Sequence, residues 1–505
     1  MQVQVLSSVP NREYYLNQIK FGTSGHRGII GKTFTNQHVS AIAQAIALHF
    51  KEKKNKKPKV LIGYDTRTGN SPTLDTASYT FTLLNELIKK KVQVDFCDSY
   101  SPTPVISLAV KTYDYDMGII LTASHNPPNY NGIKINDENG APASIELTQK
   151  IETEANRIFH HIDPDEPVYS NDDVERVNFT SAFIDHLQTI IKEKFLLPFP
   201  NFSEEYIIDP KCGSAIDIWR ALSSAGIGKI HWLNDQYSSD FNFNIPDPTS
   251  TSSIQTLSKL CKKNTCIAFA NDPDADRHVI IDENGQYISP EKLTCIIIQY
   301  CHDEGIPVDS VATTFANSVL IKKICQKHSI RCIETNIGFK YFTPHLLVAS
   351  NQNKLSFGVE SSGGFSISNH TLDKCGFLPI LLIIGIMKKK DKTLAELSAS
   401  IDTVFSKFIF VEDAITIPSS ANISLSERLS IKQHILDRLF SNVKIDNINY
   451  SDGLKIDFNN NDWVLCRPSG TEPLIRIYAE SNTKESAQYY IDQLKGLLED
   501  ASVVK

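Results

Sequence analysis

Short apolar runs that end in turn residues alternate with stretches of helical periodicity along most of the chain. One helical stretch at 76–90, for example, lies between two such runs. Strands that alternate with helices in this way predict α/β domains, in which each sheet is buried between layers of helices. The strands predicted from these runs are KVLIGYD (59–65), VQVDFCD (92–98), MGIIL (117–121), YIID (206–209), CIAFA (266–270) and SVATT (310–314).

Polar connectors divide this pattern at 161–173 and near 288–292, and a last segment begins at about 405. That segment ends with a predicted strand, RIYAES, and a predicted helix at 484–500. Proline-bearing polar stretches between periodic segments are typical of loops and linkers. We therefore expect four domains, which would span residues 1–160, 161–290, 291–403 and 404–505.

Composition narrows the possible classes. Hydrophobic residues make up 41% and charged residues 22% of the 505 residues, as in ordinary globular proteins. Lys and Arg total 51 against 58 Asp and Glu, so the net charge of −7 disfavours a nucleic-acid partner. An anionic substrate would instead need a local positive pocket. The most basic run, at 51–59, is interpreted as a solvated helix end rather than a binding patch.

Cysteine usage and hydropathy bear on location. The ten cysteines form no C-x-x-C pair, which indicates buried thiols in a reducing compartment. The most apolar run, at 376–387, is shorter than the roughly 20 residues of a membrane helix. The N-terminus shows neither the basic nor the apolar region of a secretory signal. We expect a cytoplasmic protein without a membrane partner. The pattern carries no signal of oligomeric state.

The segment GHRGIIGKT at 25–33 superficially matches a nucleotide-binding P-loop. Five residues separate Gly25 from Gly31, whereas that motif has four before its Gly-Lys-Thr. No strand is predicted before it either. A kinase or ATPase is therefore disfavoured.

Three carboxylates follow the predicted strand CIAFA. Asp272, Asp274 and Asp276 alternate within NDPDADR, so they can converge at the end of the strand. Three hard oxygen ligands suit Mg²⁺, and without a cation they would repel one another. Position six of this loop holds Arg277 where an EF-hand requires glycine, which excludes an EF-hand even though position twelve holds Glu283. An exposed acidic turn is the alternative interpretation.

Ser124 follows the predicted strand MGIIL, within TASHNPP at 122–128. It should therefore sit at the carboxyl edge of a sheet, where open α/β domains bind ligands, and its hydroxyl could carry a phosphoryl group. The G-x-S-x-G elbow of hydrolases is absent, and the adjacent His125 does not by itself make a catalytic dyad. A purely structural turn is the alternative.

Two further loops offer polar groups. In GVESSGG at 358–364, Glu360 and Ser362 could bind vicinal sugar hydroxyls, although for this loop alone a glycine-rich hairpin is the favoured interpretation. In RPSGTEP at 467–473, a guanidinium, two hydroxyls and free backbone amides could form a phosphate cradle. An ordinary surface turn is the alternative there. The cradle residues are Arg467, Ser469, Gly470 and Thr471, and Arg476 on the following strand could add charge.

Taken together, these loops resemble the α-D-phosphohexomutase superfamily, which interconverts sugar 1-phosphates and 6-phosphates. FGTSGHRG at 21–28, TASHNPP, NDPDADR, GVESSGG and RPSGTEP occur in the family's order across nearly the whole chain. The resemblance implies four domains around a central cleft. The first three would share a mixed-sheet α/β topology, and the fourth would be a smaller α+β phosphate-binding domain.

The resemblance also implies roles for individual residues. Ser124 would be the phosphoserine and, with Asp272, Asp274 and Asp276, would complete a Mg²⁺ site. Glu360 and Ser362 would contact the sugar, and Arg467, Ser469, Gly470 and Thr471 would grip the phosphate that does not react. The further positions that resemble family site residues are Arg27, His125, Lys134, Arg277, Gly338, Lys340 and Lys374.

One position departs from the family pattern. Many members end the sugar loop with a histidine that acts as acid or base, whereas the corresponding residue here is Gly364. A lysine, Lys134, is therefore the candidate for that role.

The expected activity is reversible interconversion of hexose 1-phosphate and hexose 6-phosphate, with glucose or mannose as the sugar. A hexose 1,6-bisphosphate would be both intermediate and activator, and a small phosphosugar would be the only partner. Phosphoglucosamine mutase is the first alternative. A metal-dependent sugar phosphatase and a non-catalytic sugar-phosphate sensor are weaker ones.

Overall fold

The computed structural model describes residues 18–52, 57–73, 75–162, 174–199, 204–416, 429, 431–468 and 474–499. The chain forms two compact units. The first contains 1–287 together with 370–381, and the second contains 288–369 and 382–505. A short piece of chain from the second half of the sequence therefore belongs to the first unit.

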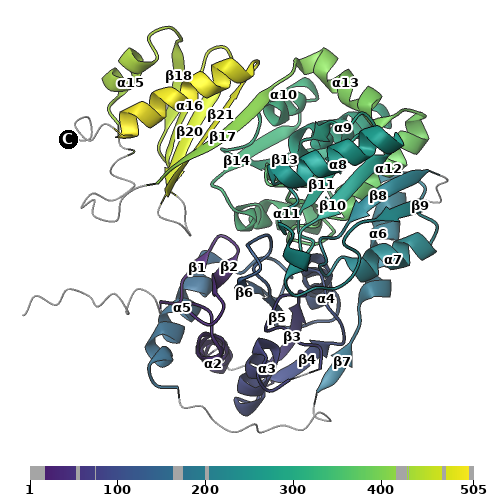
Figure 1. The fold of residues 1–505 in the computed structure, drawn as a ribbon, viewed down its shortest axis with the longest axis vertical. Helices are drawn as coiled ribbons and strands as arrows, with labels where there is room; N and C mark the ends of the chain where they lie inside the picture. The colour runs from purple at the N-terminus through teal and green to yellow at the C-terminus, as the bar shows by residue number, and fades with distance from the viewer. Residues whose placement is uncertain are drawn as a thin grey trace, which may run out of the picture. The chain divides into compact units, whose positions relative to one another are not determined.

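The first unit begins with a seven-stranded mixed sheet in the order β1-β2-β6-β5-β3-β4-β7. Strand β3 is parallel to β4 and β5, and the central strand β5 is antiparallel to β6. Helices surround this sheet (Figure 1), and the apolar side chains of the sheet and of the helices are buried between them. The elements are β1 (Phe21–Gly22), β2 (Gly25–Ile29), α2 (Asn36–Glu52), β3 (Lys59–Tyr64), α3 (Tyr79–Lys89), β4 (Gln93–Cys97), α4 (Thr103–Thr112), β5 (Met117–Leu121), β6 (Tyr130–Asn136), α5 (Ile145–Phe159) and β7 (Glu175–Val177).

A second sheet in this unit has the order β12-β11-β10-β8-β9. Its strands β8 and β10 are parallel. The chain turns back from β10 into the antiparallel strand β11 through residues 272–277, the acidic loop. The buried indole of Trp219 donates to Asn271 Oδ1 at 2.7 Å, directly before that loop. The elements are α6 (Thr180–Phe195), β8 (Glu205–Asp209), α7 (Ile216–Ser224), β9 (Lys229–Trp232), α8 (Thr251–Asn264), β10 (Ile267–Asn271), β11 (His278–Ile281) and β12 (Tyr287–Ile288).

The second unit opens with a four-stranded mixed sheet in the order β14-β13-β15-β16. The connector expected at 288–292 is short, because Ser289 caps α9 by accepting the N–H of Lys292. The apolar run at 376–387 lies largely in helix α12. The elements are α9 (Pro290–Asp303), β13 (Val308–Thr314), α10 (Val319–Lys327), β14 (Arg331–Thr335), α11 (Thr343–Asn351), β15 (Leu355–Val359), β16 (Phe365–Ile367), α12 (Leu378–Lys390) and α13 (Leu394–Phe405).

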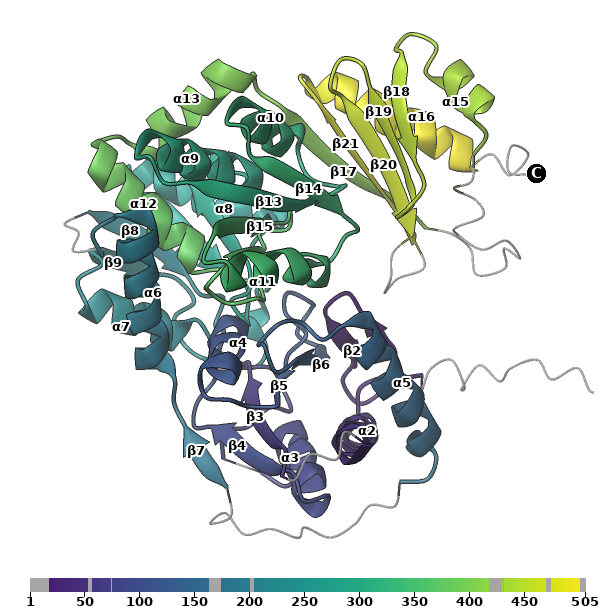
Figure 2. The same cartoon turned by 180° about the vertical axis from the view of Figure 1, so that it is seen from behind.

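The last sheet is antiparallel, with the order β17-β21-β20-β19-β18. Helices α15 and α16 lie on one side of it (Figure 2) and share its apolar core. Alternate residues therefore face that core, and Trp463, Leu465 and Arg467 face the other side. The elements are β17 (Ile409–Thr416), α15 (Gln433–Leu439), β18 (Ile445–Asn449), β19 (Leu454–Phe458), β20 (Trp463–Pro468), β21 (Leu474–Ser481) and α16 (Lys484–Glu499).

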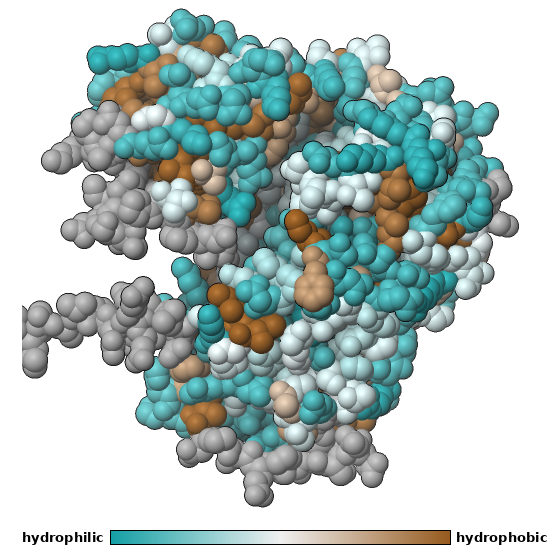
Figure 3. Space-filling model, in the orientation of Figure 1, coloured by the Kyte–Doolittle hydropathy of each residue, from teal (hydrophilic) through white to brown (hydrophobic). Residues whose placement is uncertain are grey.

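These four sheets confirm the predicted fold class, three mixed α/β domains and a smaller α+β domain. Of the helices within the described residues, none combines the length and apolarity that a membrane crossing requires. On the face drawn in Figure 3, apolar side chains gather in small patches separated by polar surface.

Replacing Trp219 with phenylalanine tests the anchor of the acidic loop. The variant leaves Asn271 Oδ1 without its donor, and a buried unsatisfied acceptor costs about 1–3 kcal/mol. We expect a lower urea midpoint by circular dichroism. Trp232→Phe, at a half-buried strand end, is the matched control. Equal midpoints for the two variants would contradict the role of the indole.

Candidate active site

Ser124 lies just beyond the carboxyl end of β5, as the sequence predicts. It is fully buried and adopts a left-handed backbone conformation with φ of 52°. Its N–H donates to Thr122 Oγ1 at 2.8 Å, and Thr122 Oγ1 donates to Asp65 Oδ2 at 2.6 Å. A non-glycine residue in this conformation is strained unless its surroundings hold it. The serine loop is therefore held by its neighbours.

Arg67, which follows β3 and is completely buried, fixes this loop through hydrogen bonds. Its guanidinium donates to the backbone carbonyls of Ser124, Asn126, Pro127 and Tyr130. Asp65 balances the buried charge through an Nε contact of 3.2 Å. Arginine offers five donors in a rigid fork, which a lysine could not match. Sequence reasoning missed Arg67, although its position at a strand's carboxyl end was a usable signal.

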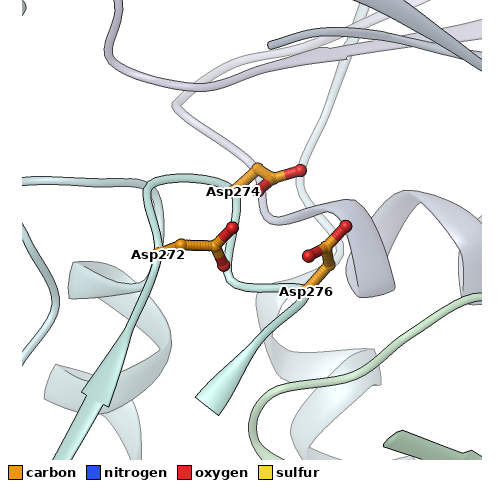
Figure 4. Close-up of side chains that lie close together, drawn as sticks. All are labelled: Asp272, Asp274 and Asp276. Carbon is orange, nitrogen blue, oxygen red and sulfur yellow. The ribbon is translucent and has the colours of Figure 1, made fainter. Parts of the chain in front are cut away.

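The three aspartates of the acidic loop converge beyond the end of β10 (Figure 4). All three are fully buried, and one oxygen from each lies within 4.8 Å of the others. The Ser124 hydroxyl donates to Asp272 Oδ2 at 2.6 Å, so the serine loop and the acidic loop meet directly. The Thr103 hydroxyl, at the start of α4, donates to Asp274 Oδ2 at 2.7 Å.

The trio fits a divalent cation. At this spacing, each pair of ionised carboxylates repels by about 3 kcal/mol with an effective dielectric constant near 20. The Oδ1 atoms of Asp274 and Asp276 are buried and accept no hydrogen bond from the described residues. Buried anionic oxygens without donors are what a hard cation such as Mg²⁺ would satisfy.

Cationic side chains crowd the same place. Lys134 Nζ contacts Asp274 Oδ2 and Asp276 Oδ2, and Lys374 Nζ lies 3.1 Å from Asp276 Oδ2. Burial acts against the charge of Lys134, but the two carboxylates outweigh it and raise the pKa of its ammonium. Burial likewise acts to raise the pKa of Asp276, but the charges of Lys134, Lys374 and Arg277 lower it. Lysine side chains are therefore concentrated at the acidic trio, where they offset its negative charge.

Asp272 is the exception among the three acids. Burial, and then the charges of Asp274 and Asp276, raise its pKa well above the usual range. Its contacts are the Ser124 hydroxyl and the N–H of Arg277, the latter at 3.0 Å. The negative charge of Asp272 is therefore the least stabilised of the three.

Arg27 and His125 flank the serine. The Arg27 guanidinium, on β2, donates to Asn126 Oδ1 at 2.6 Å, and burial lowers its pKa to about 10, so it stays charged at neutral pH. His125 Nδ1 lies 3.3 Å from Ser124 Oγ. Burial, with the charges of Arg277 and Arg27, holds the pKa of His125 well below its usual range. Its imidazole is therefore neutral beside the serine.

Chain from residues 370–381 completes the acidic loop. The Gly376 N–H donates to Ala275 O at 3.0 Å, and a side chain at Gly376 would collide with Arg277 O. Asn136 Nδ2 donates to Asp373 Oδ2 at 3.1 Å, which fixes the segment beside β6. These contacts deliver Lys374 to Asp276 from a part of the sequence about a hundred residues away.

In the second unit, Asn317 organises the predicted sugar loop. Its Nδ2 donates to Val359 O at 2.7 Å, and its Oδ1 accepts the N–H of Ser361 at 2.8 Å. Glu360 lies between these two bonds and is buried, and Ser362 follows on a half-buried turn. Sequence reasoning missed Asn317, which precedes its contacts by more than forty residues.

The remaining predicted residues also fall in this unit. Gly338 has φ of 132°, a conformation that favours glycine, and burial lowers the pKa of the nearby Lys340. Arg467 and Arg476 face each other on β20 and β21, and Arg476 pairs with Glu412 at 2.9 Å. Three of the predicted cradle residues lie outside the described residues: Ser469, Gly470 and Thr471.

Four family profiles match the chain in order, each described as a phosphoglucomutase/phosphomannomutase domain. Domain I matches residues 18–161, domain II 182–285, domain III 289–404 and the C-terminal domain 426–497.

Whole-length relatives carry more than one activity name. A phosphoglucomutase of Komagataeibacter xylinus is 28% identical, covering 94% of this chain and 89% of its own. A probable phosphoglucosamine mutase of Methanosphaera stadtmanae is 29% identical, covering 92% of this chain and 95% of its own. The crystal structure of a putative phosphomannomutase from Thermus thermophilus superposes with a TM-score of 0.78 at 23% identity, covering 96% of this chain and all (100%) of that one.

Replacing one aspartate of the acidic trio should affect the melting temperature differently with and without magnesium. Asp272→Asn removes one of three repelling charges, so without divalent cations its melting temperature should equal or exceed that of the wild type. Millimolar Mg²⁺ should stabilise the wild type by several degrees, because a ligand that binds only the folded state raises its stability. The variant should lose this shift, as differential scanning fluorimetry can measure.

Asp446→Asn, at an exposed position on β18, is the control and should keep the full magnesium shift. A full shift in Asp272→Asn would show that the trio does not hold the ion.

Proposed function

Because the chain belongs to the phosphoglucomutase/phosphomannomutase family, we propose that it interconverts hexose 1-phosphates and hexose 6-phosphates through a phosphoserine at Ser124. The chain is therefore an enzyme of the isomerase type. The observation that carries the proposal is the buried hydrogen bond, 2.6 Å long, from the Ser124 hydroxyl to Asp272 of the acidic trio.

In the proposed reaction, the Ser124 phosphate passes to the free hydroxyl of the sugar phosphate. The product of this step is a 1,6-bisphosphosugar, which turns within the site and returns its other phosphate to Ser124. A covalent donor in this way divides an awkward migration into two direct transfers. The O–P bond at the serine breaks as the sugar O–P bond forms, and the reverse follows, so the net change is isomerisation.

Asp272, Asp274 and Asp276, with the phosphate on Ser124, would hold Mg²⁺, which would offset charge on the transferring group. The protein itself adds cations: Arg27 lies beside the serine loop, and Lys374 beside Asp276. These charges favour a phosphoserine, which carries about −1.5 to −2 near neutral pH.

Lys134 is the proposed acid/base group, in place of the histidine that Gly364 replaces. Its raised pKa keeps a proton on Nζ while Asp274 and Asp276 remain its partners. The protonated form is the one that can donate to the departing serine oxygen, while the raised pKa makes this ammonium a weaker acid.

The other end of the substrate is proposed to bind residues of the second unit. Glu360 and Ser362 would accept and donate hydrogen bonds to sugar hydroxyls. Arg467, with Ser469, Gly470 and Thr471, would grip the phosphate that does not react, and Gly338, Lys340 and Arg476 would lie close to it. The four proposed domains are 1–160, 161–290, 291–403 and 404–505.

Glucose and mannose phosphates are the proposed substrates, and glucosamine phosphate is the alternative, since relatives carry both kinds of name. Assays with glucose, mannose and glucosamine 1-phosphates side by side would decide between them, with the matching 1,6-bisphosphate as activator. The cytoplasm is the proposed compartment, in keeping with ten free cysteines.

Ser124→Ala tests the covalent step. We expect at least about a thousandfold loss of mutase turnover, because the phosphoryl carrier itself is removed. The urea midpoint should change little, since the hydroxyl makes one buried hydrogen bond. Such a bond contributes about 1 kcal/mol to the free energy of unfolding. Intact-mass spectra should show one phosphoryl group on the wild type and none on the variant.

Ser224→Ala, on the exposed end of α7, is the control for this variant and should keep both turnover and the phosphoryl mass. Turnover by Ser124→Ala at the wild-type rate would exclude the phosphoserine mechanism.

Arg467→Ala tests the proposed binding of the non-reacting phosphate by Arg467. A charge-assisted hydrogen bond contributes about 1.5–3 kcal/mol, so KM should rise by roughly 10- to 100-fold with a smaller change in kcat. Steady-state kinetics measure both. Arg438→Ala, at an exposed position on α15, should leave KM unchanged. An unchanged KM in Arg467→Ala would contradict the proposed grip.

A further inference from the structure

The turn between β18 and β19 presents one carboxylate to two predicted substrate-binding segments. Asp452 Oδ1 lies 3.7 Å from Arg467 Nη2 at the end of β20. Asp452 Oδ2 accepts the backbone N–H of Ile337 at 2.9 Å, immediately before Gly338. A single side chain therefore joins the proposed phosphate-binding strand to the loop that carries Gly338 and Lys340.

This turn is built to lie against Arg467. Gly453 follows Asp452 with φ of 101°, in the region that favours glycine. A Cβ at Gly453 would collide with Cys466 O and would lie 2.9 Å from the Arg467 Cβ. No larger residue fits there without displacing β20, so the Asp-Gly pair fixes the carboxylate beside this guanidinium.

Arg467 is partly buried and keeps unused hydrogen-bonding capacity. Its contact with Asp452 is longer than a hydrogen bond, and its Nε is a buried donor without an acceptor among the described residues. Arg476, directly opposite on β21, differs because Glu412 pairs with it at 2.9 Å. Asp452 therefore lies beside the Arg467 charge without a hydrogen bond to it, and Arg467 Nε keeps no acceptor among the described residues.

We propose that Asp452 is a positioning residue that presents Arg467 to the substrate phosphate and couples it to the loop at 337–340. The proposal rests on the proposed function, in which Arg467 grips the phosphate that does not react. Asp452 itself touches no substrate. It restricts the rotamers of Arg467 before binding, and pre-orientation of this kind strengthens an interaction without adding a contact.

Asp452→Asn separates the two contacts of the side chain. Its amide oxygen can still accept the Ile337 N–H, but the charge beside Arg467 is lost. We expect KM for the sugar phosphate to rise by about 3- to 10-fold, with kcat changed by less than about 2-fold, because the ion pair that orients Arg467 is lost. Asp452→Glu keeps the charge and should recover part of the lost affinity.

A double-mutant cycle with Arg467→Ala distinguishes positioning from general damage. If Asp452 acts through Arg467, Asp452→Asn should change KM by less than about 1.5-fold once Arg467 is alanine. A merely structural role would give the same KM increase in both backgrounds and would overturn the proposal. A lower KM in the single variant would also overturn it, because the carboxylate would then oppose phosphate binding.

The same cycle keeps this inference apart from the proposed function. If Arg467→Ala alone leaves KM unchanged, the phosphate grip itself is wrong. If Arg467→Ala raises KM but the two changes are additive, only the role of Asp452 is wrong. Asp437→Asn, exposed on α15, is the matched control. If Asp452→Asn is too unstable to assay, the cycle is run with Asp452→Glu, whose smaller effect must also vanish without Arg467.

Discussion

Three buried carboxylates held within one short loop repel one another, and that repulsion sets the conditions for the rest of the site. Arg277 of the same loop offsets part of it, with its Nε 3.8 Å from Asp276 Oδ1. Further cations come from other elements, Lys134 from β6 and Lys374 from the returning chain. The same concentration of opposite charges suits the phosphoryl group and the divalent ion of the proposed function.

The serine depends on a different constraint, the strained backbone of its loop. A left-handed Ser124 is stable only while the carbonyls around it are fixed, and Arg67 fixes four of them from one buried guanidinium. Asp65 makes two of the contacts that support this loop. It pairs with Arg67, and it accepts a hydrogen bond from the Thr122 hydroxyl. Electrostatic balance and backbone geometry are thus supplied by the same few residues.

The sequence alone predicts the fold class from its alternating strands and helices. It also predicts where Ser124 and the aspartates lie, because they follow apolar runs that indicate buried strands. A residue at such a strand end lies at the ligand-binding edge whatever the detailed packing. Arg67, Thr103, Asn317 and Asp452 were not predicted, although Arg67 and Asn317 also follow predicted strands. Their roles arise from contacts with residues that are far away in sequence, and no local period records such contacts. The charge state of Lys134 depends on them in the same way.

The return of residues 370–381 to the first unit has a consequence for dissection of the chain. A fragment that stopped at Tyr287 would contain the whole acidic loop but would lack the Gly376 amide that closes it and the Lys374 charge that neutralises Asp276. The first unit therefore cannot be obtained intact by truncation. Only a spliced polypeptide, with 370–381 grafted after a linker, would reproduce it.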